Sequence, residues 1–151
     1  MTKLEEKISG FIKNRSEDGF LIVKQSNMEG ENVDFFLLYG KTKIYIECAI
    51  INDKTKDELV SLISVVKRNC RVDGTLMSKL LELNGQLLYG AFGIVEDIVF
   101  YRYSVLGGQH IDEDVFFNAL YAVTQESQDF DAKIGIDFIE DEVKKEDGND
   151  L

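Results

Sequence analysis

Few side chains in this sequence are suited to covalent or acid–base catalysis. The chain has one histidine, His110, and two cysteines, Cys48 and Cys70. A structural zinc site needs four nitrogen or sulfur ligands, and a nucleophilic cysteine or serine needs a base positioned beside it. Nothing in the spacing of these three residues supports either arrangement. We therefore expect His110 in a surface loop and both cysteines as small buried apolar residues.

One short segment resembles the end of a phosphate-binding loop. Gly40-Lys41-Thr42 has the right residue types, but Phe35 stands where that loop needs its first glycine. The motif also requires a helix after the threonine, and the residues that follow here alternate as in a strand. The sequence therefore excludes a phosphate-binding loop at this place.

A second segment has part of the pattern of a calcium-binding loop. The acidic residues at the first, third, ninth and twelfth positions are Asp129, Asp131, Asp137 and Glu140. Lys133 occupies the fifth position, a ligand position, and Ile134 occupies the sixth, where the turn needs glycine. Because a cation at a ligand position lowers the affinity for calcium, we expect no bound metal, and no cofactor is indicated elsewhere.

Asp34 and Glu47 are carboxylates inside expected strands, and they would form an acid–base pair if the strands brought them together in a pocket. On the polar face of an antiparallel sheet they would instead point to solvent. The second arrangement is the expectation, so we expect a protein that is not an enzyme. An enzyme that uses Asp34 and Glu47 is kept as an alternative hypothesis.

Composition indicates one globular domain. The chain has 151 residues, of which 44% are apolar and 30% charged, and its formal net charge is −11. That charge argues against nucleic acid or an anionic membrane as the main partner. The first residues carry Glu5 and Glu6 without an apolar stretch, and no apolar run approaches the roughly 20 residues that a membrane span needs. We expect a cytoplasmic protein with one domain over residues 1–140 and a disordered acidic tail over 141–151.

The first half of the chain predicts a helix followed by three strands. Thr2 and Glu5 form a capping box, and an apolar stripe over residues 2–14 indicates an amphipathic helix. Strands are expected at 20–23, 33–39 and 43–51, the last two as a hairpin around Gly40-Lys41.

The second half predicts three helices and a further hairpin. Thr55 and Glu58 suggest a capping box, and Leu59, Leu62, Ile63 and Val66 then recur at helical spacing over residues 55–68. Further helices are expected at 75–86 and after Asp112, which suits an N-cap, and a hairpin at 88–95 and 98–105. The last helix either continues through Phe130, Ile134 and Phe138 or gives way to a short strand at 134–138. The order α-β-β-β-α-α-β-β-α indicates an α+β fold, a twisted antiparallel sheet of about five strands with helices packed on it.

The order of elements and residues 80–134 resemble the YbjN-type domain family. The similar features are a helix ending at 80–84, a strand with Gly90, Phe92 and Ile94, a second strand with Arg102, the loop into Ile111-Asp112-Glu113, and a last helix reaching Asp129 and Asp131. The resemblance covers about residues 5–138. It implies a fold related to that of the dimeric class I type III secretion chaperones, and a regulatory or chaperone-like role without a catalytic residue.

The resemblance and the absence of a catalytic set predict a module that holds a segment of a partner protein, and a homodimer. Tyrosine suits exposed interfaces, so the candidate partner-binding residues are Tyr39, Tyr45, Tyr101, Arg102 and Tyr103. Arg102 would otherwise form a cross-strand ion pair. The alternative function is an acidic inhibitor or immunity-type protein that blocks a basic enzyme.

Overall fold

The computed structural model describes residues 2–27 and 33–135, with side chains for 2–19 and 35–135. In chain order the elements are α1 (Lys3–Asn14), η1 (Ser16–Asp18), β1 (Phe20–Asn27), β2 (Val33–Tyr39), β3 (Thr42–Asn52), β4 (Asp57–Lys67), α2 (Gly74–Gln86), β5 (Ala91–Val95), β6 (Ile98–Val105), η2 (Gly108–His110) and α3 (Glu113–Ile134). The expected acidic tail at 141–151 lies outside the described residues.

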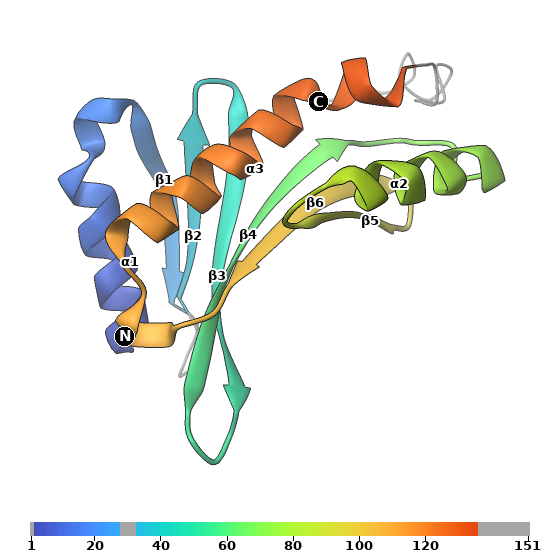
Figure 1. Ribbon diagram of the computed structural model, residues 1–151. Coiled ribbons are helices and arrows are strands. Elements are labelled where there is room, and N and C mark those ends of the chain that lie inside the picture. The colour runs from blue at the N-terminus through green and yellow to red at the C-terminus, as the bar shows by residue number, and fades with distance from the viewer. Residues whose placement is uncertain (1, 28–32, 136–151) are drawn as a thin grey trace.

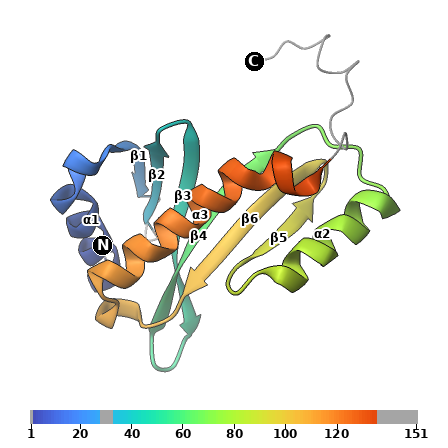
Figure 2. The same ribbon diagram turned by 45° about the horizontal axis from the view of Figure 1, so that its top comes forward.

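One antiparallel sheet organises the chain. Its strand order is β1-β2-β3-β4-β6-β5, so the first four strands form a meander and α2 carries the chain to the far edge. Figures 1 and 2 show α1, α2 and α3 on the same side of the sheet, with α3 running across it. The predicted α+β fold, an antiparallel sheet with helices packed on it, is confirmed. Within the described part of the chain, no helix has both the length and the apolar character to cross a bilayer.

The first helix forms for the reason that the sequence suggests. The Thr2 hydroxyl accepts a hydrogen bond from the Glu5 amide at 3.2 Å, and the Glu5 carboxylate accepts one from the Thr2 amide at 3.0 Å. This capping box satisfies two free amide donors. The side chains of Leu4, Ile8 and Ile12 are buried below it, each no more than 2% exposed. The predicted helix is confirmed.

The prediction of a helix at 55–68 is wrong, because this segment forms the strand β4. The sheet therefore has six strands, and the expected order has one helix too many. Leu59, Leu62, Ile63 and Val66 fit helical spacing because β4 is apolar on both faces, so its residues match either period. The run is rich in β-branched side chains, and pairing with β3 and β6 on its two sides fixes it as a central strand. Of the predicted cap residues, Thr55 lies in the preceding turn, where Asn52 accepts hydrogen bonds from the Lys54 and Thr55 amides, and Glu58 lies in β4 itself.

The last helix continues to Ile134 and ends at Gly135, whose φ is 70°. Phe130 and Ile134 are therefore helical and buried, at 3% and 1% exposed, and the expected alternative of a strand starting at 134 is wrong there. Phe138 lies outside the described residues. Asp112 is the N-cap residue as predicted, although its side chain makes no capping hydrogen bond. Arg15, next to the end of α1, contacts Glu113 at 3.1 Å and Asp114 at 2.8 Å, which joins the two helices.

A side chain from α2 forms hydrogen bonds with the outer backbone groups of the edge strand β5. Asn84 donates to the Phe92 carbonyl at 3.0 Å and accepts from the Phe92 amide at 2.7 Å. The Asn84 amide thus takes both bonds that a neighbouring strand would make with Phe92. Since unpaired edge groups are a template for intermolecular strand pairing, this contact protects the edge.

We predict that Asn84→Ala lowers the free energy of unfolding by about 1–3 kcal/mol, because it leaves two partly buried backbone groups without a partner. Denaturant unfolding measures the change, and sedimentation measures any self-association through the opened edge. Asn118→Ala, on an exposed position of α3, is the matched control and should change stability by at most about 0.5 kcal/mol. Equal losses in the two variants would contradict the role of Asn84.

Candidate functional site

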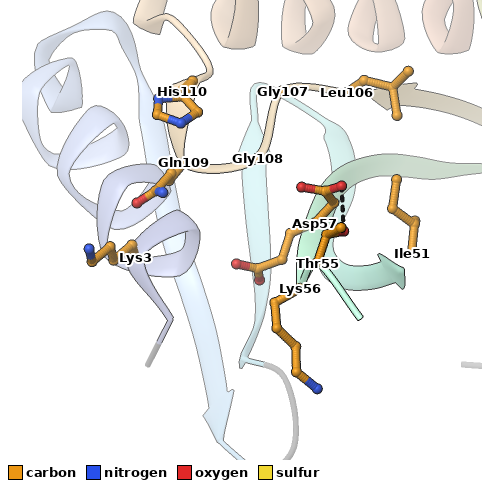
Figure 3. Close-up of a pocket in the computed structure, with 11 residues that line it drawn as sticks. Lys3, Ile51, Thr55, Lys56, Asp57, Leu106, Gly107, Gly108, Gln109 and His110 are labelled. Carbon is orange, nitrogen blue, oxygen red and sulfur yellow. Dashed lines mark hydrogen bonds between the residues drawn. The ribbon is translucent and has the colours of Figure 1, made fainter. Parts of the chain in front are cut away.

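A cavity of about 440 Å³ lies between the β3–β4 turn and η2, and it contains the single histidine. Figure 3 shows His110 and Gln109 on one side and Thr55 and Asp57 on the other. The Thr55 hydroxyl donates to Asp57 at 2.6 Å, and the Thr2 hydroxyl donates to Glu58 at 3.0 Å. The carboxylates at this cavity are therefore bonded to hydroxyls of the protein itself.

The residues that sequence reasoning examined for chemistry lie apart. His110 is exposed in the η2 turn, as expected, and Cys48 and Cys70 are buried, as expected. Asp129 and Asp131 are in the helix α3, whose geometry is not that of a calcium loop, and the other two positions of that pattern lie outside the described residues. Among the described residues, no group of three His, Cys, Asp or Glu side chains is placed to hold a metal ion.

The register makes Asp34 and Glu47 direct partners on β2 and β3, so the backbone does bring these two positions together. Glu47 is exposed on the side of the sheet away from the helices. Such a carboxylate is solvated, whereas the enzyme hypothesis requires the two carboxylates to converge in a pocket.

The side of the sheet without helices is the second candidate, and we call it the open face. Alternation along β3 separates it from the core: Ile44, Ile46 and Cys48 are each 0% exposed, whereas the residues between them face outward. The described open-face residues of β2, β3, β4 and β6 are Phe36, Leu38, Lys43, Tyr45, Glu47, Leu59, Ser61, Ile63, Val65, Phe100, Arg102 and Ser104. Most are apolar, which is unusual for the solvent-facing side of an antiparallel sheet.

One row of residues crosses this face from strand to strand. Phe36 pairs with Tyr45, Tyr45 with Ile63, and Ile63 with Arg102. The Phe36 and Tyr45 rings are 4.7 Å apart between centroids, and Tyr45 is 45% exposed. The row therefore places an aromatic pair and an exposed guanidinium on one surface.

Near the β5 edge of the open face, the Phe100 ring lies directly against the backbone of Gly93. A Cβ built on Gly93 would lie 2.5 Å from the Phe100 ring, so that ring covers the glycine directly. The Arg102 guanidinium carbon lies 5.6 Å from the centre of the same ring. Arg102 makes no ion pair with another residue in the described part of the chain, so the expected cross-strand ion pair is not present there.

At one end of the open face the surface is hollowed by a pocket of about 390 Å³, which we call the basic pocket. Its lining residues are Phe36, Lys43, Tyr45, Val65, Val66, Lys67 and Arg68. Three are cations, four are apolar or aromatic, and none of the described lining residues is acidic. A chain with a net charge of −11 thus carries a positively charged apolar hollow on its uncovered sheet face.

A break in the strand pairing shapes this pocket. The pairing of β4 with β6 shifts between Val65 and Lys67, which marks a β-bulge or similar irregularity. Such a shift re-aims side chains, and Val65, Val66 and Lys67 all contribute to the lining of the hollow. The Val66 side chain also packs against the core, and the Lys67 ammonium pairs with Asp131 of α3.

The five candidate partner-binding residues divide between the two faces. Tyr45 and Arg102 are exposed on the open face, with Ile63 between them. Tyr101 is 0% exposed, so the expectation of its exposure is wrong; its hydroxyl donates to the Tyr89 carbonyl at 2.8 Å. Tyr39 and Tyr103 are partly buried against the core, Tyr39 near Tyr121 and Tyr103 stacked on Tyr89.

Sequence reasoning missed Phe36, Val65 and the cations at the end of β4. The helix expected at 55–68 removed β4 from the sheet, and with it the neighbours of Tyr45. A signal was present, because a central strand that is apolar at consecutive positions leaves apolar residues on whichever face the helices do not cover.

Compared with known proteins, the chain matches no protein-family model and no curated protein. The resemblance to the YbjN-type family therefore stays a prediction, and the site is interpreted from its own geometry.

Burial of Tyr101 gives a prediction about pH. Desolvation raises the pKa of this phenol, and the negative charge of Glu126 raises it further. The folded state therefore favours the neutral phenol. This contribution to stability is fully present below the unfolded-state pKa of about 10 and is lost as the pH rises toward the folded-state pKa.

We predict that stability at alkaline pH depends on Tyr101. Above pH 10 the free energy of unfolding of the wild type should fall by up to about 1.4 kcal/mol per pH unit more than that of Tyr101→Phe. Denaturant unfolding between pH 8 and about 11.5 measures both slopes. Tyr45→Phe, which alters an exposed tyrosine, is the control and should keep the wild-type slope. Identical slopes for wild type and Tyr101→Phe would contradict the prediction.

Proposed function

We propose that this protein is a non-enzymatic, chaperone-like or regulatory module that holds an extended segment of a partner protein on its open face, anchored in the basic pocket. The observation that carries the proposal is the composition of this pocket, which combines aromatic and aliphatic side chains with the exposed cations Lys43 and Arg68 on a face that no described element covers. Exposed apolar surface rimmed by polar groups is characteristic of interaction sites.

The pocket specifies the chemistry of its ligand. Phe36, Tyr45 and Val65 offer apolar contact area, which favours apolar anchor residues in the partner. Lys43 and Arg68 are exposed at the rim and favour carboxylates beside those anchors. The partner segment is therefore apolar with acidic flanks. The tyrosine–phenylalanine pair suits such binding because rigid rings lose little conformational entropy on contact.

The alternative of an acidic protein that blocks a basic enzyme stays a prediction. The open face does not favour it, since the described unpaired charges nearest the apolar residues are mostly positive: Lys43, Arg68 and Arg102, against Glu47. Lys67 is paired with Asp131. A basic partner would need another surface of the molecule. The expected homodimer also stays a prediction, and a second copy on the open face is one outcome of the test below.

The test is a selection from a displayed library of random 12-residue peptides against the full chain. We expect the selected peptides to combine apolar residues with Asp or Glu, and to bind with affinities that weaken as salt is raised. The variant Lys43→Glu/Arg68→Glu should bind the same peptides about tenfold more weakly, because two rim charges become repulsive.

The matched control is Lys54→Glu/Lys56→Glu, which makes the same charge change on exposed lysines of the β3–β4 turn, away from the pocket. It should leave affinity unchanged within about twofold at 150 mM salt, because of screening over that separation. Selected peptides that are basic, or that lose equal affinity in both variants, would overturn the proposal. Sedimentation of the full chain with and without Tyr45→Glu reveals a second copy on this face, which would replace the partner segment as its occupant.

A further inference from the structure

The end of α3 lies beside the basic pocket. Asp131, one turn before the helix ends, accepts from the Lys67 ammonium at 3.2 Å, and Lys67 is itself a lining residue of the pocket. Gly135 then ends the helix in a left-handed conformation. The chain that follows α3 therefore begins near the same end of the sheet at which the pocket opens. Figure 1 shows the ends of α3 and β4 at this end of the sheet.

The sequence that follows has the chemistry that the pocket favours. Residues 136–143 read IDFIEDEV, with four apolar side chains and four carboxylates. The apolar residues are Ile136, Phe138, Ile139 and Val143, and the acidic residues are Asp137, Glu140, Asp141 and Glu142. The lining of the pocket is the complement, with four apolar or aromatic residues and the exposed cations Lys43 and Arg68, besides Lys67, which pairs with Asp131.

The length of this segment is sufficient. The proposed segment, residues 136–143, begins directly after Gly135, and eight extended residues at about 3.3 Å each reach about 26 Å. The path has only to pass round the end of the sheet at Lys67, from the helix side to the open face. Phe138 and Ile139 are the fourth and fifth residues after the helix, which ends at Ile134.

We propose that residues 136–143 bind the basic pocket of the same chain and compete there with the partner segment. This inference rests on the proposed function, because it gives the same pocket an internal ligand of the same chemistry. Phe138 and Ile139 supply the apolar anchors, and the carboxylates of Asp137 and Glu140 pair with the rim cations.

Tethering makes even a weak contact effective. A short linker holds its ligand at an effective concentration on the order of 1 mM. A tail segment with an intrinsic dissociation constant of about 0.1–0.3 mM would therefore occupy the pocket most of the time and weaken partner binding by about 4- to 11-fold. A partner segment binds only by displacing it, which sets a threshold affinity for partners.

The first experiment places a nitroxide spin label on the full chain at Lys145→Cys, just beyond the proposed segment. The native cysteines are buried, at 0% and 7% exposed, so the new cysteine is the accessible one. We expect paramagnetic broadening of the amide signals of Lys43, Tyr45 and Val65. The signals of Thr55 and Asp57, at the other end of β3 and β4, should keep their intensity.

The variant Phe138→Asp/Ile139→Asp removes the apolar anchors and should abolish this broadening. Leu151→Asp, the same kind of change at the last residue, is the control and should leave it unchanged. Broadening confined to the α2–α3 side, at Ser78 and Lys79, would overturn the proposal, as would an absence of broadening. A mixture of isotope-labelled chains with separate spin-labelled chains tests whether the tail of one copy binds the pocket of another. Broadening only in that mixture would also overturn the proposal.

A second measurement separates this inference from the proposed function. Phe138→Asp/Ile139→Asp should bind the selected acidic–apolar peptides about 4- to 11-fold more tightly than the wild type, since the internal competitor is removed. Equal peptide affinity without broadening would reject the internal ligand and leave the partner-binding function intact. Broadening of the pocket signals without any peptide binding would reject the partner-binding function and leave the internal ligand.

Discussion

The pairing of β4 with β3 on one side and β6 on the other is the interaction on which the rest of the structure depends. β4 joins the N-terminal meander to the C-terminal hairpin, so both halves of the sheet meet along it. Its face toward the helices completes the core, with Val60, Leu62 and Ser64 at most 1% exposed. Its opposite face carries Leu59, Ile63 and Val65 into an area that no described helix covers. One strand thus stabilises the fold and supplies the centre of the interaction surface.

Local sequence signals predicted the elements that depend on local interactions. The capping box of α1 and the two-residue turn at Gly40, where φ is 62°, both depend on contacts between near neighbours in sequence. Local signals did not predict β4 as a strand, because its conformation depends on partners distant in sequence. Ser61, for example, lies opposite Ser104, with their hydroxyl oxygens 2.7 Å apart. Where tertiary pairing overrides a local pattern, the period of apolar residues alone does not decide between helix and strand.

The same limit explains the outcome for the candidate site. Tyrosine was a reasonable marker of an interface, yet side-chain alternation assigned Tyr45 to the open face and Tyr101 to the core. Arg102 reached the open face because it follows Tyr101 directly in β6. The cations of the basic pocket had no signal of their own, since Lys67 and Arg68 look like the basic end of a helix. Only the sheet register, which the sequence does not encode locally, brings them near Phe36 and Lys43.

The lining of the basic pocket comes entirely from the stretch between Phe36 and Arg68, and this has a consequence for the order of assembly. Neighbouring antiparallel hairpins close short loops and form quickly, whereas pairing β4 with β6 requires closure across about 40 residues. During synthesis from the N-terminus, strands β2, β3 and β4 are complete before the hairpin β5–β6 and α3 exist. The strands that line the pocket can therefore pair on a nascent chain whose C-terminal half is still unmade, and the β4–β6 irregularity that shapes the pocket and the covering of the core by α3 come afterwards.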